Sequence, residues 1–189
     1  MRYIIEHLDG KRLYKWCFLE YKHISEIVGK ENLLFTNIKS EKAKLQLEPF
    51  GTVESKSVTE LQPKRVCILD PLADNILSQN DKMLFDYVIF GGILGNYPPE
   101  KRTKAKLSDK IKCEKRSLGN KQMSTDTAVY VTKKIFDGKK FNEFIFQDEI
   151  EVPAGKNLTI ELPYRYVIEN GKIIFSEELM QFMKKKKGI

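Results

Sequence analysis

Two short apolar runs end abruptly in the middle of this sequence. The first, RVCILD (Arg65–Asp70), stops at Pro71, and the second, DYVIFGG, ends in the glycine pair Gly91-Gly92. A short and continuous apolar run is typical of a strand that is buried on both faces, as the central strands of parallel sheets are. The two runs therefore favour an α/β fold with helices on both faces of a parallel sheet.

The first forty residues support the same architecture. RYIIEH (Arg2–His7) has the β-branched and aromatic content of a strand, and NLLFTNI (Asn32–Ile38) reads as a second strand. Gly29 stands before the second strand as a helix C-cap. The apolar residues between the strands have the spacing of one helical face: Leu13, Cys17, Tyr21, Ile24 and Val28. A strand, a helix and a strand in this order predict a parallel sheet.

Weaker patterns complete the chain. Residues 39–64 are polar and are expected to hold a short strand and one or two helical turns. Ser124 or Thr125 can cap a helix that carries Asp126 in its first turn and ends at Gly138. The other predicted elements are a helix within 71–84, a helix over 101–110, a strand over 110–118, strands within 144–153 and 158–175 with a turn at Asn170-Gly171, and a terminal helix over 177–185.

The composition excludes several classes of protein. The 189 residues are 41% hydrophobic and 31% charged, which fits a globular protein with one domain and a small appendage. No apolar run approaches the roughly 18–20 residues that cross a bilayer, so no membrane partner is expected. Two histidines and three widely spaced cysteines predict neither a metal site nor a disulfide. The opening segment is charged again at Glu6 and does not resemble a signal peptide, which predicts a cytoplasmic protein.

The charge gives a modest indication of the partner. A net charge of +7 favours nucleic acid, the ribosome or another acidic partner. Much of this charge lies in the run Lys184–Lys187, which we interpret as a solvated tail. The charge alone therefore leaves the partner open.

Three glycine- or proline-bearing loops follow predicted strands, and they are the best candidates for a binding site. They begin at Asp70-Pro71, at Gly91-Gly92 and at Gly119. Ligands of open α/β sheets bind beyond the carboxyl ends of the strands, where backbone groups can read the edge of a flat heteroaromatic ring. A side chain at Gly92 is expected to occupy the place of the ligand. The chain lacks the phosphate-binding Gly-x-x-x-x-Gly-Lys and Gly-x-Gly-x-x-Gly motifs and the Gly-x-Ser-x-Gly elbow.

Several strings, in the same order along nearly the whole chain, resemble one known family. They are RYIIEH, CILDP (Cys67–Pro71), FGGILGNYPPEKRTK (Phe90–Lys104), SLGNKQMSTDTAV (Ser117–Val129) and LPYRYV (Leu162–Val167). The family is the one long labelled SAM-dependent RNA methyltransferase, of the SPOUT superfamily. Its characterised eukaryotic relative methylates an arginine of a small-subunit ribosomal protein.

The resemblance implies a fold and a cofactor. It implies a SPOUT core over residues 1–138 with a deep trefoil knot around the cofactor loops, and a small β-rich extension over residues 139–189. It also implies S-adenosylmethionine as the cofactor. The cofactor contacts carried over by position are Leu69, Asp70 and Pro71; Phe90, Gly91, Gly92, Leu94 and Gly95; and Leu118, Gly119, Gln122, Met123 and Thr125.

The acceptor is an arginine of a ribosomal protein in our leading hypothesis. A guanidinium cannot be deprotonated by ordinary side chains and needs carboxylates to orient it, so Asp126 is the candidate catalytic residue, although a carboxylate there also suits the helix dipole. RNA is the alternative acceptor, and Arg102 and Arg116 are then the candidate substrate-binding residues. Asn96 and Asn120 stand where Asp is common in the family, so neither is assigned to catalysis.

Two further expectations concern assembly and activity. The extension after residue 138 carries enough apolar sequence to cover the core within one chain, so we expect a monomer. A noncatalytic ribosome- or RNA-binding module is a less favoured alternative. A protein that no longer bound the cofactor would not need the loop glycines, which are all present: Gly91, Gly92, Gly95 and Gly119. Tyr164 and Tyr166 share one side of a strand, and core packing is favoured for them over stacking on a substrate.

Overall fold

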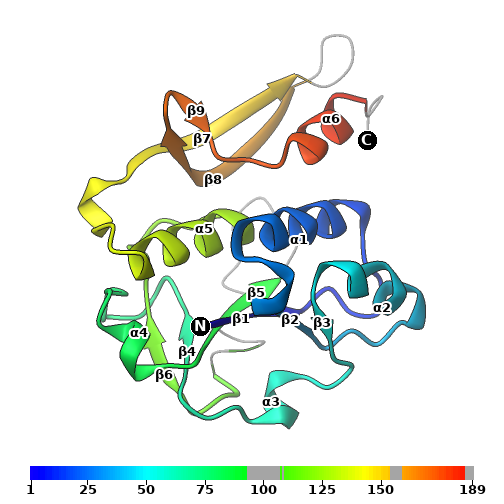
Figure 1. Ribbon diagram of the computed structural model, residues 1–189. Helices are drawn as coiled ribbons and strands as arrows, with labels where there is room; N and C mark the ends of the chain where they lie inside the picture. The colour runs from blue at the N-terminus through cyan, green and yellow to red at the C-terminus, as the bar shows by residue number, and fades with distance from the viewer. Residues whose placement is uncertain (93–106, 108, 154–158, 186–189) are drawn as a thin grey trace.

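A six-stranded parallel sheet forms the centre of the molecule (Figure 1). The computed structural model describes residues 1–92, 107, 109–153 and 159–185. The strand order is β3-β2-β1-β5-β4-β6. The strands are β1 (Arg2–His7), β2 (Leu33–Thr36), β3 (Thr52–Val53), β4 (Val66–Leu69), β5 (Tyr87–Gly92) and β6 (Glu114–Arg116). The two apolar runs of the sequence are therefore neighbouring strands inside the sheet, as predicted.

One face of the sheet is covered by two long helices, α1 (Lys15–Val28) and α5 (Thr125–Phe136), which lie side by side in Figure 1. Successive strand residues point to opposite faces, and Ile5, Phe35 and Phe90 pack with these helices. The predicted C-cap of α1 is confirmed, because Gly29 has φ 81° and donates its backbone N–H to the Ser25 carbonyl.

The other face packs against shorter segments. Ile4, Ile68 and Ile89 form a buried cluster there with Val58 and Leu107. Val58 begins the short helix α3 (Val58–Leu61), which a Ser57–Glu60 capping box holds at its start. The remaining short helices are α2 (Glu41–Leu47) and α4 (Asp81–Leu84), with 3-10 turns over Lys30–Asn32, Glu48–Phe50 and Phe141–Glu143. Helices thus lie on both faces of the sheet.

A three-stranded antiparallel sheet forms a further layer above α1 and α5 (Figure 1). Its strands are β7 (Ile145–Pro153), β8 (Thr159–Glu169) and β9 (Lys172–Ile173), and helix α6 (Glu177–Lys185) follows them. The predicted turn at Asn170-Gly171 is confirmed, with φ values of 52° and 73°. The interface is apolar, because Leu19 of α1 packs with Tyr166, Leu179 and Met183, and Tyr166 is thereby a core residue. The predicted division of the chain at residue 138 stays a prediction.

The segment between β4 and β5 differs from the prediction of a longer helix. Only the single turn α4 is helical, because the residues before it run beside β6. The N–H of Leu77 donates to the Ser117 carbonyl, and the N–H of Ser117 donates to the Asn75 carbonyl. Backbone groups engaged in these bonds cannot form a helix. The helix predicted over residues 101–110 falls largely outside the described residues.

Candidate functional site

The carboxyl ends of β5, β4 and β6 lie next to one another at one edge of the sheet. The ladder between β4 and β5 ends at the pair Ile68 and Ile89, whereas the ladder between β1 and β5 continues to His7 and Gly92. The end of β5 therefore extends past its last pair with β4. We use the name cofactor notch for the strand ends Leu69–Pro71 and Phe90–Gly92 together with the loop that follows β6. Backbone groups at such a notch are available to a ligand.

The loop after β6 reaches the same notch. Gly119 has φ 82°, a conformation that favours glycine and turns the chain back toward β5. At the end of the loop, the hydroxyl of Thr125 donates to the Gly91 carbonyl over 3.4 Å. The three segments that sequence reasoning selected are therefore brought together. Backbone N–H and C=O groups at this notch can form hydrogen bonds with the edge of a heteroaromatic ring, and the adenine of S-adenosylmethionine is such a ring.

The predicted contact residues take different places around the notch. Three of them, Leu69, Phe90 and Leu118, have side chains that are buried in the core. Asp70 is buried and its carboxylate accepts the Leu72 N–H, while Pro71 is exposed. The backbone carbonyl of Gln122 accepts the Arg165 N–H, and Met123 bridges to the same residue of β8. Leu94, Gly95 and Arg102 lie outside the described residues.

The expectation that a side chain at Gly92 would occupy the place of the ligand is wrong. A Cβ atom at this position would overlap the hydroxyl oxygen of Tyr21 and lie 2.8 Å from Ile5 Cγ2. It would therefore point into the core beneath α1 and not into the ligand site. Strand alternation is the reason, since Gly92 shares the face of Phe90. The glycine is needed here for close packing of α1 on the sheet, whereas a contact between its backbone and the cofactor stays a prediction.

Asp126 lies at the start of α5 and is 1% exposed. Its Oδ2 is 2.8 Å from Nδ1 of His23, and its Oδ1 accepts from the Ser124 hydroxyl and from the Thr127 N–H. Both carboxylate oxygens therefore already have protein partners. The side chain of His23 is 15% exposed, so the imidazole is the more accessible partner of this pair.

Glu20 of α1 is a buried carboxylate that sequence reasoning missed. Its Oε1 accepts the N–H groups of Thr125 and Asp126, so it caps α5 from another helix. Burial and the nearby charge of Asp126 raise the pKa of Glu20 to about 8. The signal was present in the sequence, because Glu20 stands on the apolar face of α1 between Cys17 and Ile24.

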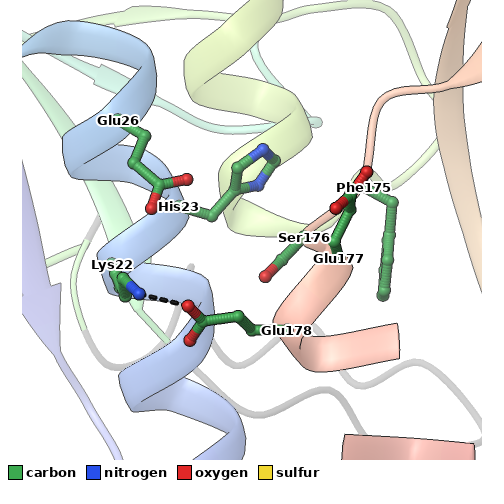
Figure 2. A pocket seen from close by; sticks show the side chains of 7 residues that line it. All are labelled: Lys22, His23, Glu26, Phe175, Ser176, Glu177 and Glu178. Carbon is green, nitrogen blue, oxygen red and sulfur yellow. Dashed lines mark hydrogen bonds and ion pairs between the residues drawn. The ribbon is translucent and has the colours of Figure 1, made fainter. Parts of the chain in front are cut away.

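His23 was missed as well, and it links the buried acids to the surface. Burial lowers the pKa of the imidazole, but the hydrogen bond that the imidazole donates to Asp126 and the negative charge of this carboxylate outweigh it, so the pKa of His23 is raised. His23 also lines an open pocket of about 280 Å³ between α1 and the start of α6 (Figure 2). The other lining residues are Lys22, Glu26, Phe175, Ser176, Glu177 and Glu178.

Arg116 does not have the role predicted for it in RNA binding. Its guanidinium is only 11% exposed and donates to Asp81 Oδ1 over 2.9 Å and to Glu114 Oε2 over 3.1 Å. It also stacks over the ring of Phe85 at 5.2 Å. These contacts join β6 to α4, so the arginine stabilises the fold and is not presented to a phosphate.

In the part of the chain that the structure describes, no group of three or more His, Cys, Asp or Glu side chains could hold a metal ion. No helix among the same residues has the length and apolar character to span a membrane.

Comparison with known proteins supplies the relatives of this fold. The family described as "Protein arginine N-methyltransferase SFM1-like" matches residues 2–188. The protein arginine N-methyltransferase SFM1 of Saccharomyces cerevisiae is 36% identical over 203 residues, which cover 98% of this chain and 95% of the yeast protein.

Solved structures agree with this assignment. The yeast SFM1 structure in complex with SAH superposes with a TM-score of 0.85 at 36% identity and covers 97% of this chain and 94% of the yeast chain. A Trm10 structure from Thermococcus kodakaraensis shares the fold at 19% identity, with a TM-score of 0.55 over 76% of this chain and 96% of its own. The chain therefore belongs to the SFM1-like family of protein arginine N-methyltransferases.

Proposed function

We propose that this protein transfers a methyl group from S-adenosylmethionine to an arginine of a ribosomal protein. The observation that carries the proposal is the position of the acids Glu20 and Asp126. Asp126 lies in the first turn of α5, and Glu20 of α1 accepts the N–H group of Thr125 at the start of that helix. The hydroxyl of Thr125 in turn contacts the Gly91 carbonyl at the cofactor notch. Carboxylates beside a methyl donor suit a cationic acceptor. The same surroundings disfavour the phosphates of RNA.

The cofactor and the protein have separate tasks in this reaction. When bound, S-adenosylmethionine supplies a methyl group on a sulfonium that is already activated, so the transfer depends above all on alignment. The strand ends at Leu69–Pro71 and Phe90–Gly92 would hold the cofactor by their backbone groups. Asp126 of α5 and Glu20 of α1 would give the acceptor side of the cofactor site an acidic character. The conformation that we propose for the cofactor loops is the trefoil knot of SPOUT proteins.

We also propose that the protein acts as a monomer in the cytoplasm. The antiparallel layer already covers α1 and α5, the faces that a second copy could otherwise cover. Cys17, Cys67 and Cys113 are free thiols, which suit a reducing compartment. Sedimentation at micromolar concentration should give about 22 kDa, and a mass of twice this value would contradict the proposal.

Methyl transfer can be tested with labelled cofactor. The purified chain would be incubated with methyl-labelled S-adenosylmethionine and small ribosomal subunits, and protein would then be separated from RNA. Acid hydrolysis of the protein fraction should yield labelled methylarginine. Label found in the RNA fraction, with none in protein, would favour the RNA alternative and overturn the arginine assignment.

A further inference from the structure

The loop from Gly119 to Met123, which we call the β6–α5 loop, pairs with a strand of the antiparallel layer. The N–H of Arg165 in β8 donates to the Gln122 carbonyl over 2.9 Å, and Met123 forms an isolated bridge with the same residue. This loop carries the third group of predicted cofactor contacts. A loop that contacts a ligand needs a support that fixes its backbone, and β8 supplies such a support.

Side chains reinforce this pairing. Nε of Arg165 donates to Oδ1 of Asp148 over 2.7 Å, and Nη2 donates to Oδ2 over 3.3 Å, so the ion pair is bidentate. The same carboxylate accepts a hydrogen bond from Nζ of Lys121, which belongs to the β6–α5 loop. Asp148 thereby joins the loop to both β7 and β8. We call Lys121, Asp148 and Arg165 the Arg165 network.

A β-bulge lies directly beside this carboxylate. The register between β7 and β8 shifts between Asp148 and Ile150, and Glu149 between them has φ 63°. A bulge bends its strand and can redirect a side chain. Hydrogen bonds from Arg165 and Lys121 lower the pKa of Asp148 to about 2, so the network keeps its charges at neutral pH.

Aromatic side chains support the other end of the loop. The guanidinium carbon of Arg165 lies 5.0 Å from the centre of the Phe146 ring, and this ring is 5.6 Å from that of Phe141. A Cβ atom at Gly119 would lie 3.3 Å from Phe141, so this ring is close to the glycine turn. Both Gly119 and the Gln122 carbonyl therefore contact residues that follow the core in the sequence.

A second set of ion pairs of β8 shows what is particular to the Arg165 network. Glu169 lies 3.6 Å from both Lys134 and Lys139 and so attaches the end of β8 to α5 and the residues after it. The hydrogen bonds of a helix already hold α5 in shape. The β6–α5 loop lies outside the helices and strands, so its shape depends more on contacts such as those of the Arg165 network.

We propose that Arg165 and Asp148 are positioning residues for S-adenosylmethionine, which hold the β6–α5 loop in the shape that binds the cofactor. The inference rests on the proposed function, because it takes the cofactor notch as the binding site. Both side chains act through the backbone of Gly119–Met123. Cofactor binding and attachment of the antiparallel layer then strengthen each other, because a coupling between two events is reciprocal.

Calorimetry with SAH tests the positioning role. Arg165→Gln keeps the backbone N–H that bonds Gln122 but loses the bidentate pair, and it should bind SAH about tenfold more weakly. Arg165→Lys keeps the charge and should restore part of the affinity. Glu169→Gln breaks ion pairs of the same strand that do not touch the loop, so this matched control should bind SAH normally. If Arg165→Gln binds SAH as tightly as Glu169→Gln does, the inference is wrong.

Variants of the loop contact keep the test independent of any damage to the antiparallel layer. The side chain of Lys121 is 54% exposed, so Lys121→Gln should fold normally, and it should bind SAH about threefold more weakly. Adding Lys121→Gln to Asp148→Asn should cause no further loss of affinity, because the two changes break the same contact. Full and additive losses would contradict the network.

Kinetics separate positioning from catalysis. With small ribosomal subunits as substrate, Arg165→Gln should raise the KM for S-adenosylmethionine about tenfold and leave kcat within about twofold of the wild-type value. A lower kcat with an unchanged KM would place Arg165 in the chemical step and overturn the positioning role. If the wild-type protein itself binds no SAH, the proposed function fails and the inference fails with it. Normal SAH binding by both the wild type and Arg165→Gln rejects the inference alone.

Discussion

At the scale of single residues, the largest difference from expectation is at Gly92. Its missing side chain makes room for Tyr21 and Ile5, and these residues pack α1 onto the sheet. Gly92→Ala should therefore destabilise the fold by about 1–3 kcal/mol, the usual cost of overpacking a core. Urea denaturation of the two proteins measures this difference in the free energy of unfolding.

A second substitution shows whether the clash is the cause. Tyr21→Phe removes the hydroxyl that the new methyl group would overlap, at the cost of its hydrogen bond to His7. The double variant should therefore be more stable than the sum of the two single effects predicts. Additive costs would show that the methyl group at position 92 meets no obstacle at Tyr21.

Glu20 should make the stability depend on pH. Burial raises its pKa to about 8, so between about pH 4.5 and 8 the folded protein holds a proton that the unfolded chain has released. Stability must then fall as the pH rises through this range. Glu20→Gln keeps an oxygen to accept the N–H groups of Thr125 and Asp126 and removes the ionisation.

The measurement for Glu20 is the free energy of unfolding at several pH values. The stability of Glu20→Gln relative to the wild type should increase by at least about 1 kcal/mol between pH 5 and pH 8. Glu151→Gln, on exposed β7, should follow the pH dependence of the wild type. A Glu20→Gln protein that also follows it would contradict burial of an ionisable carboxyl group.

At the scale of secondary-structure elements, Arg116 joins β6 to α4. The pair with Asp81 is nearly buried, so removal of the arginine leaves a buried carboxylate without its partner. Arg116→Ala should cost about 3 kcal/mol of stability. Arg65→Ala breaks an exposed pair with Asp86 and should cost about 1 kcal/mol or less. Equal costs in thermal denaturation would mean that the Arg116 pair does not hold these elements together.

At the scale of the whole molecule, the antiparallel layer and the core share one apolar interface. Leu179 of α6 is buried against Leu19 of α1, and Trp16, the single tryptophan, packs at the same interface. Leu179→Ala should therefore lower the stability of the entire chain by about 2–5 kcal/mol. Leu45→Ala, at a position that is 68% exposed, should have little effect.

The same variant tests whether residues 139–189 unfold separately. Trp16 fluorescence reports the interface, and far-ultraviolet circular dichroism reports all helices and strands. We expect the two urea transitions of Leu179→Ala to coincide, as they do for one cooperative unit. A fluorescence transition that precedes the dichroism transition would show that the C-terminal layer is an independent domain.

The sequence by itself determined the elements and their order. Short continuous apolar runs identified β4 and β5, because strands inside a parallel sheet are buried on both faces. β-Branched and aromatic content identified β1, and helical spacing of apolar residues identified α1 and α5. Glycines and Pro71 marked the strand ends that meet at the notch, since parallel strands place all their carboxyl ends at one edge.

Only the tertiary structure decided which side chains face one another. Gly92 and Arg116 looked like ligand-site residues, and their partners Tyr21 and Asp81 come from elements distant in the sequence. His23 and Asp126 are 103 residues apart, so no local pattern could pair them. Local periodicity fixes which face of an element is buried. Long-range packing fixes what that face meets, and it made His23, not Asp126 alone, the residue that reaches the pocket.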